Sequence, residues 1–167
     1  MQKTYNDIIS LNGTLAGMSR ERWPFGTILA KNIKIMDKVI MDYNELRQAI
    51  IDKYVMRDEA GEILGVFRPV NPDQELKEGE ERMVERIKNP RRIDETEWTD
   101  REAFDKELAE LNESMTELEL VPVDLNTVFF NMQANRDMKI SEFIDANMEP
   151  SLMLFLSDYG FWKNFEE

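Results

Sequence analysis

One stretch constrains the fold more than any other, because residues 27–54 carry an apolar stripe at the spacing of a long amphipathic helix. Apolar side chains recur along it at alternating steps of four and three residues. The stripe consists of Leu29, Ile33, Met36, Ile40, Tyr43, Arg47, Ile50 and Tyr54. Only Arg47 interrupts it, and Leu46 fills the gap because an α-helix drifts relative to a seven-residue repeat. With no Pro or Gly inside the stretch, we predict one continuous helix, roughly 40 Å long at about 1.5 Å per residue.

The opposite face of this stretch is polar and is expected to face solvent. Its residues are Lys31, Asn32, Lys34, Lys38, Asp42, Glu45 and Gln48. A helix of this kind cannot bury its stripe alone and needs a partner. A second stripe follows, at Phe104, Leu108, Leu111, Met115 and Leu118, and the pattern Thr99-x-x-Glu102 before it is typical of a capping box. We therefore predict a helix over 100–115 that packs antiparallel against 27–54, with Met36 and Met115 in the packed seams.

The segment between the two helices changes character. Residues 55–57 and 63–67 flank the turn-forming cluster Asp58-Glu59-Ala60-Gly61, so we predict a β-hairpin there. Residues 73–98 are dominated by Glu, Lys and Arg and offer few apolar anchors. We interpret 73–98 as a charged, mobile linker or insert that allows the chain to reverse direction. The alternative is a short charged helix whose apolar residues are Met83, Val84 and Ile87.

The rest of the chain predicts short elements. These are a helix over 3–11, a strand within 118–123, a helical turn over 125–131 capped by Asp124, a strand over 138–140, and a helix with Ser141 as its N-cap. Pro150 opens a last helix over 151–159, which Gly160 ends. The predicted fold is mainly α within the α+β class: an antiparallel long-helix hairpin with a small β-hairpin or sheet and a C-terminal helical cap. At 167 residues we expect a single domain over 1–167.

Acidic charge is concentrated beyond the first third of the chain. The net charge is −13, and residues 1–50 contribute +2 whereas residues 51–167 contribute −15. Such a field disfavours direct nucleic-acid binding, because phosphate contacts need clustered Lys and Arg, but it permits docking onto a basic protein surface. The alternative is that the acidity only keeps the protein soluble. The candidate partner-binding residues on this acidic face are Glu78, Glu80, Glu81, Glu107, Glu110, Glu113 and Glu117.

Residue types that commonly carry catalysis are missing. The sequence has no His and no Cys, which removes the usual general base, the imidazole and thiolate metal ligands, and any disulfide. No Gly-rich phosphate loop occurs, and no pair of carboxylates is singled out by its spacing. We expect a protein that is not an enzyme and needs no cofactor or metal. The longest apolar run, 152–156, is far too short to span a membrane, so a soluble, unsecreted protein is expected.

The C-terminal tract is the most apolar part of the chain. A segment so rich in aromatic side chains must be buried by its own domain or by another chain. The first alternative makes it part of the core, and the second makes it an interface to a partner or to a second copy in a homo-oligomer. The candidate interface residues are Phe155, Tyr159, Phe161, Trp162 and Phe165.

The order of these features resembles that of a known family. The features are Ser19-Arg20-Glu21-Arg22 before the long helix, the Asp-Glu-x-Gly hairpin at 58–61, the sequence Phe-Asp-Lys-Glu-Leu-Ala-Glu-Leu at 104–111, an acidic and apolar strand near 117–123, and the closing apolar helix. Across most of its length, the chain resembles a family of short, uncharacterised proteins carried by phages and prophages of Gram-positive bacteria. Pro24 and the long 73–98 insert depart from the family pattern. The resemblance implies a phage-borne accessory or morphogenesis protein without enzymatic activity.

Two functions from different classes follow. The first is a binding protein in the host cytoplasm that inhibits a defence or nucleic-acid-processing protein, by presenting carboxylates where phosphates would lie. The second is a structural or assembly factor of the virion that oligomerises through its helices and apolar C-terminus. The partner, a host or a phage protein, is not identified by the sequence.

Overall fold

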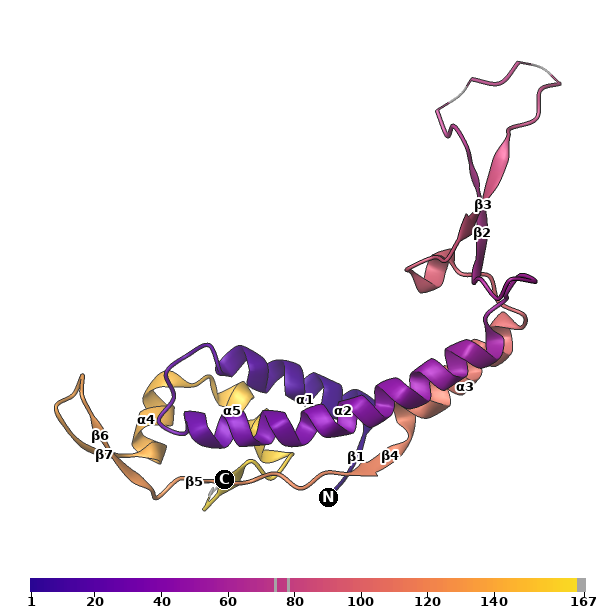
Figure 1. Cartoon of the computed structure of the whole chain (residues 1–167). Helices are drawn as coiled ribbons and strands as arrows, with labels where there is room; N and C mark the ends of the chain where they lie inside the picture. The colour runs from indigo at the N-terminus through magenta and orange to yellow at the C-terminus, as the bar shows by residue number, and fades with distance from the viewer. Residues whose placement is uncertain (74, 78, 165–167) are drawn as a thin grey trace. The chain divides into compact units, whose positions relative to one another are not determined.

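The computed structural model describes residues 1–73, 75–77 and 79–164, and it mixes α-helices with short strands in an α+β fold (Figure 1). The helices are α1 (Tyr5–Met18), α2 (Gly26–Tyr54), α3 (Arg101–Glu113), α4 (Ile140–Asn147) and α5 (Pro150–Ser157), with a 3₁₀ turn η1 (Ile93–Glu95). The strands are β1 (Gln2–Thr4), β2 (Leu64–Pro69), β3 (Val84–Lys88), β4 (Met115–Glu117), β5 (Val123–Asp124), β6 (Val128–Asn131), β7 (Arg136–Lys139) and β8 (Trp162–Lys163). Within the described residues, no helix is long and apolar enough to cross a membrane.

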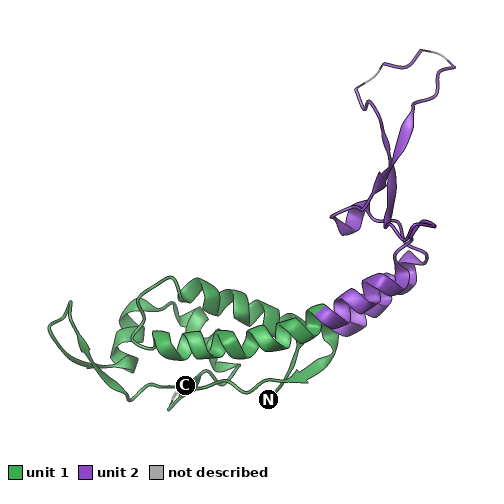
Figure 2. Ribbon diagram, viewed as in Figure 1, with its two compact units in different colours: residues 1–44, 112–167 green, residues 45–111 purple. Residues whose placement is uncertain are grey.

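The chain divides into two compact units, coloured separately in Figure 2. Unit 1 comprises residues 1–44 and 112–167, and unit 2 comprises residues 45–111. The sequence predicted a single domain, and the long helix α2 belongs partly to each unit. Unit 2 is thus an insertion between the two halves of unit 1.

The long helix α2 confirms the strongest sequence prediction, since its bounds differ from 27–54 by one residue. Leu29, Met36, Tyr43 and Ile50 of the stripe are buried at seven-residue spacing. Two details of the prediction are wrong. Leu46 is about half exposed (49%) and fills no gap in the stripe, and Asn32, assigned to the solvent face, is fully buried.

Asn32 is buried because its side-chain amide provides the hydrogen bonds that a neighbouring strand would otherwise give to the backbone of Val121. Its amide nitrogen donates to the carbonyl oxygen of Val121 (2.9 Å), and its amide oxygen accepts the Val121 N–H (2.8 Å). The segment around Val121 lies between β4 and β5 and has no strand beside it at this position. A buried polar side chain is stable only when it is hydrogen-bonded in this way.

Unit 1 contains the main apolar core. Helix α1 begins at a true capping box, in which the Thr4 hydroxyl accepts the Asp7 N–H and the Asp7 carboxylate accepts the Thr4 N–H. The helix runs through Gly13 to Met18, longer than the predicted 3–11. Its buried face meets α2, α4, α5 and the C-terminal residues in one cluster. The core residues are Ile8, Leu11, Leu15, Met18, Phe25, Leu29, Met36, Leu118, Leu120, Val123, Leu125, Ile140, Ile144, Met148, Leu156, Tyr159, Phe161 and Trp162.

Among the described residues, unit 1 also contains three two-stranded sheets. Strands β1 and β4 pair antiparallel, β5 and β8 pair parallel, and β6 and β7 form an antiparallel hairpin. The hairpin replaces the predicted helical turn over 125–131, because alternate residues of Val128–Asn131 face solvent and protein as a strand requires. Ser141 lies inside α4 and is not its N-cap, which is Lys139. Met115, predicted in a helix seam, lies in β4 and is 58% exposed.

Unit 2 combines the end of α2, the β2–β3 sheet and most of α3. The predicted hairpin of 55–57 with 63–67 is reduced to a single bridge, Arg57 to Ile63, and the main partner of β2 is β3. Part of the predicted linker 73–98 therefore forms a strand, whereas its mobility stays a prediction. Before α3, Asp100 accepts the Ala103 N–H (2.9 Å), so Asp100 takes the capping role assigned to Thr99, whose hydroxyl donates to the Tyr54 carbonyl instead.

Candidate functional site

Glu107 on α3 is held by two partners from α2. Its carboxylate oxygen accepts from Lys53 Nζ (2.7 Å) and from the Tyr54 hydroxyl (2.7 Å). The hydrogen bond from Lys53, followed by that from Tyr54, lowers the pKa of Glu107 from its ordinary value, and the bond to Glu107 raises the pKa of Lys53 to about 12. Glu107 is therefore ionised, and its charge is paired with that of Lys53.

Glu110 and Glu113 share α3 with Glu107, whereas Glu117 lies in β4, so the four predicted acidic residues do not all come from one helix. Glu110 lies in unit 2, where Lys106 Nζ is 4.0 Å from its carboxylate. Glu113 and Glu117 lie in unit 1, where Glu113 accepts from the Asn6 amide (2.9 Å) and Glu117 is paired with Gln2 across β1 and β4. The periodicity of a single helix predicted their common face, but α3 ends at Glu113 and Glu117 belongs to a strand.

Glu80 and Glu81 lie in the long connection between β2 and β3. Glu80 accepts the backbone N–H of Lys77 (3.1 Å), and both acidic residues are exposed. Glu78 lies outside the described residues. We call β2, the described residues of 70–83 and β3 the arm, which is drawn as a hairpin in Figure 1.

The arm also carries apolar side chains that the sequence analysis did not select. Phe67 on β2 is 59% exposed, and the guanidinium of Arg86 on β3 lies 4.6 Å from the centre of its ring. The other exposed apolar residues of the arm are Val66, Val70, Leu76, Met83 and Val84. The sequence did contain a sign of this surface, because apolar side chains are unusual in a charged segment that is only a solvated linker.

The C-terminal tract belongs mostly to the core of unit 1. Tyr159, Phe161 and Trp162 are buried, and the Trp162 indole donates to the Met153 carbonyl (3.0 Å). Phe161 and Trp162 both meet Phe25 edge to face. Phe155 is half-buried beside Tyr159, and Phe165 lies outside the described residues. The placement of the three buried residues favours the core alternative, and burial raises the pKa of Tyr159.

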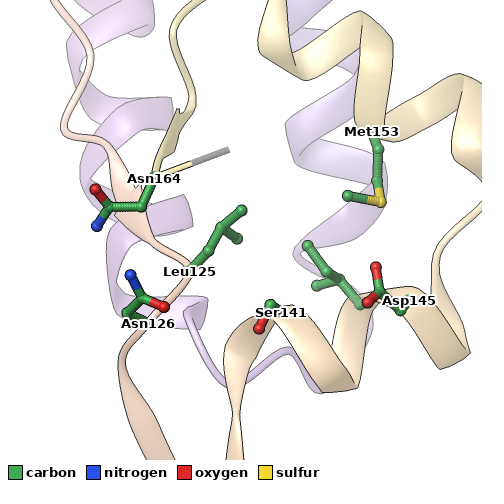
Figure 3. Close-up of a pocket in the computed structure, with 7 residues that line it drawn as sticks. Leu125, Asn126, Ser141, Asp145, Met153 and Asn164 are labelled. Carbon is green, nitrogen blue, oxygen red and sulfur yellow. The ribbon is translucent and has the colours of Figure 1, made fainter. Parts of the chain in front are cut away.

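An open pocket of about 400 Å³ lies in unit 1 (Figure 3). Asn126 and Asn164 line one side, and Ser141 and Asp145 of α4 line the other, with Leu125, Ile144 and Met153 as its apolar part. Beside it, Asp124 accepts the Asn126 N–H (3.0 Å) and the Asn164 amide (2.8 Å), and these two bonds lower the pKa of Asp124. The pocket can offer hydrogen bonds, but the sequence has no His to activate Ser141.

The acidic side chains do not gather for metal chemistry either. Among the described residues, no group of three or more Asp or Glu is placed to hold one cation. Exposed apolar side chains occur on two surfaces: the arm in unit 2 and the β6–β7 hairpin in unit 1, where Phe130 and Met132 are exposed. In comparisons with known proteins, no family model, no curated protein and no solved structure matches this chain.

Proposed function

We propose that this chain is a non-enzymatic binding protein whose arm holds a partner protein with a basic surface. The observation that carries the proposal is the mixture of exposed groups on the arm. Residues 70–83 contain five acidic and two basic side chains, and the exposed apolar residues Leu76 and Met83 lie within the same segment. A solvated linker would need only the charges.

The two kinds of side chain would play different parts in binding. Apolar and aromatic groups, Phe67 above all, supply affinity when a partner covers them. Carboxylates speed the encounter with a basic surface and exclude acidic ones. A basic channel that normally binds nucleic acid fits this chemistry, because carboxylates can stand where phosphates would lie.

The proposal includes the context that the sequence resemblance implies. The partner is a host defence or nucleic-acid-processing protein, and the chain acts in the host cytoplasm as a phage-borne inhibitor. Within this proposal, Glu80 and Glu81 contribute more than Glu107, whose charge is already matched by Lys53.

The proposal also includes the predicted antiparallel hairpin of long helices, which would support the arm. In unit 2, Val55 bridges to Trp98, the ring of Tyr54 meets Phe104, and Lys53 pairs with Glu107. In these three contacts the residue number decreases from 55 to 53 on the α2 side while it increases from 98 to 107 on the α3 side. This order supports antiparallel packing of the two helices in this unit.

The test compares two variants with the same change in charge. Glu75, Glu80 and Glu81 are changed to Lys in the arm, and Asp42, Glu119 and Asp137, all exposed in unit 1, are changed to Lys in the control. Each tagged variant is used to capture partners from a lysate of Gram-positive bacteria, and captured proteins are quantified by mass spectrometry. The arm variant should lose a basic partner that the wild type and the control retain.

Salt dependence then tests the mechanism. Exposed charges are screened within about 10 Å at 0.1 M salt, so affinity for the captured partner should fall steeply as salt rises, and a nucleic acid bound by that partner should compete. The proposal would be contradicted if the arm variant still captured the partner, or if the control variant lost the partner to the same extent as the arm variant.

The alternative is an assembly factor of the virion, and one observation favours it. Phe129 of β6 packs against Phe143, whereas Val128 and Phe130 point outward and Met132 in the hairpin turn is 85% exposed. Such an apolar edge suits contact with another copy. Light scattering of the wild type and of Phe130→Ser at increasing protein concentration tests this alternative. If it is right, the wild type should self-associate, Phe130→Ser should associate more weakly, and salt should leave the association unchanged.

A further inference from the structure

A cavity in unit 2 explains the single interruption of the apolar stripe on α2. The cavity has a volume of about 260 Å³ and lies between the end of α2 and residues 90–98. Arg47, the residue that breaks the stripe, lines it together with Arg91 and Arg92. No acidic residue is among the described residues that line the cavity.

This basic character is unusual for its surroundings. Unit 2 carries 12 basic and 19 acidic side chains, a net charge of −7, and most of its arginines are paired with carboxylates, as in Arg57 with Asp52 and Arg68 with Glu85. Arg92 is paired with Asp94 (3.0 Å). Arg47 and Arg91 have no carboxylate within 4 Å among the described residues. Two unpaired guanidinium groups therefore line the same cavity.

The remaining lining combines the polar side chains of Gln48 and Thr96 with an apolar wall. Ile51 comes from the last turn of α2 and Val55 follows the end of this helix, whereas Ile93 comes from η1 and Trp98 follows η1. Trp98 is fixed by stacking on Phe104, with ring centres 3.9 Å apart. Its indole N–H is shielded from solvent and has no acceptor among the described residues. The shielded N–H is not open to a ligand in the cavity, so Trp98 contributes to the wall through its ring.

We infer that this cavity binds a small organic anion: a carboxylate or phosphate attached to a compact apolar body. The guanidinium group is planar and donates two parallel hydrogen bonds, which matches carboxylate and phosphate oxygens. The apolar wall would take the body of the ligand. Ligand cavities commonly measure about 300 Å³ or more, so the body is limited to a single ring or a short branched chain.

Two sources could supply this chemistry, a free small acid or the carboxyl end of a peptide. Phenylacetate represents the first source and N-acetylphenylalanine the second. Phenylacetamide has the same apolar body without the negative charge, and acetate has the charge without the body. The site requires that an anion with a ring binds more tightly than both of these controls.

The readout is the indole N–H signal of Trp98 in ¹H–¹⁵N correlation spectra of the full chain. The sequence has three Trp residues, and Trp98→Phe assigns the signal by its disappearance. Phenylacetate or N-acetylphenylalanine should shift this signal saturably, and the tighter of the two identifies the source. Phenylacetamide and acetate should bind at least tenfold more weakly.

Charge removal completes the test. Arg47→Gln together with Arg91→Gln should weaken binding at least tenfold, and Arg91→Gln alone, at an exposed position, should weaken it in the same direction if the double variant does not fold. Arg68→Gln, on β2 and outside the cavity, removes an arginine of the same unit and should leave binding unchanged. An unshifted Trp98 signal, equal binding of phenylacetamide, or undiminished binding by Arg91→Gln would overturn the inference.

Discussion

The apolar core of unit 1 draws side chains from both ends of the chain, whereas the buried apolar side chains of unit 2 are Ile50, Val55 and Phe104 among the described residues. Ion pairs are instead concentrated in unit 2. Of the pairs between described residues, only Arg136 with Glu142 lies in unit 1. Apolar burial contributes about 25 cal/mol per Å², and an exposed ion pair is worth only about 0–1 kcal/mol. Unit 2 should therefore be the unit that opens more easily.

This difference separates stability from binding. Unit 2 leaves Phe67 and its neighbours on the arm exposed, although it has little apolar core of its own. A unit that opens easily and exposes apolar groups is suited to adapt to a partner, and regions of low local stability are commonly the ones that bind. Unit 1 supplies a stable body.

The largest effect is expected for Phe161→Ala in unit 1. Phe161 is fully buried and meets Phe25 and Trp162 edge to face. Its truncation should reduce the free energy of unfolding by about 3–5 kcal/mol, measured by urea denaturation. The matched change Phe67→Ala in unit 2 should cost less than about 1 kcal/mol, because that ring is mostly exposed. Similar costs for the two variants would abolish the contrast between the units.

Asn32→Ala should give the next largest effect. It removes both hydrogen bonds to Val121 and leaves the partly buried N–H and C=O of Val121 without protein partners, which should cost about 1–3 kcal/mol. Gln48→Ala is the control, because its side chain is exposed and donates only to Asp52 (3.3 Å). Thermal unfolding compares the two variants, and an equal shift in Tm would show that the Asn32 bonds add no stability.

The third prediction contrasts two glycines. A Cβ at Gly65 in unit 2 would lie 2.7 Å from the Glu95 carbonyl oxygen and 2.7 Å from Ile87 Cβ, so Gly65→Ala should destabilise by about 1–3 kcal/mol through overpacking. A Cβ at Gly13 in α1 would have nothing within 4 Å, so Gly13→Ala should stabilise by about 0.5–1 kcal/mol through helix propensity. Hydrogen exchange should place the loss in unit 2 and the gain in unit 1. If both variants changed the free energy of unfolding in the same direction, the close packing at Gly65 would be contradicted.

The sequence predicted helices well because periodicity is a local signal. The apolar stripe located α2 to within one residue, and the second stripe located α3, which spans 101–113 instead of 100–115. The pairing of β2 with β3 was missed because the partner strand lies beyond residues 70–83, and local turn chemistry at 58–61 indicated a nearer partner. Asn32 was misassigned because its burial depends on Val121, 89 residues away.

The surroundings of the candidate site residues could not be predicted from the sequence, for a related reason. Glu80 and Glu81 could be selected from charge alone and remain candidates, because they lie exposed on the arm. Glu107 could not be separated from them by composition, since its pairing requires Lys53 and Tyr54 to be near in space. The role of Arg47 was equally hidden. Its interruption of the stripe was visible, but the cavity that it lines is formed by residues 90–98 as well.

The smallest effect is expected at the ion pair between Lys53 and Glu107, and it tests whether unit 2 opens independently. The pKa of Glu107 is lowered in the folded chain, so its contribution is present above the ordinary value of 4.5 and is lost as pH falls through the lowered pKa. The pKa of Lys53 is raised from 10.5 to about 12, so its contribution is present below pH 10.5 and is lost as pH rises through about 12. Between pH 4.5 and 10.5 the pair should stabilise unit 2 evenly.

Hydrogen exchange of the α3 amides, compared at pH 6 in low and high salt, measures this contribution. Glu107→Gln should speed exchange in unit 2 and make it less sensitive to salt, because the screened attraction is gone. Glu110→Gln is the matched control, since Lys106 lies 4.0 Å from Glu110 and both side chains are more exposed, so its effect should be smaller. The core amides of α1 in unit 1 should exchange at the wild-type rate in both variants. If α1 exchanges faster together with α3, the two units open as one, and the arm then cannot adapt to a partner without loosening the core.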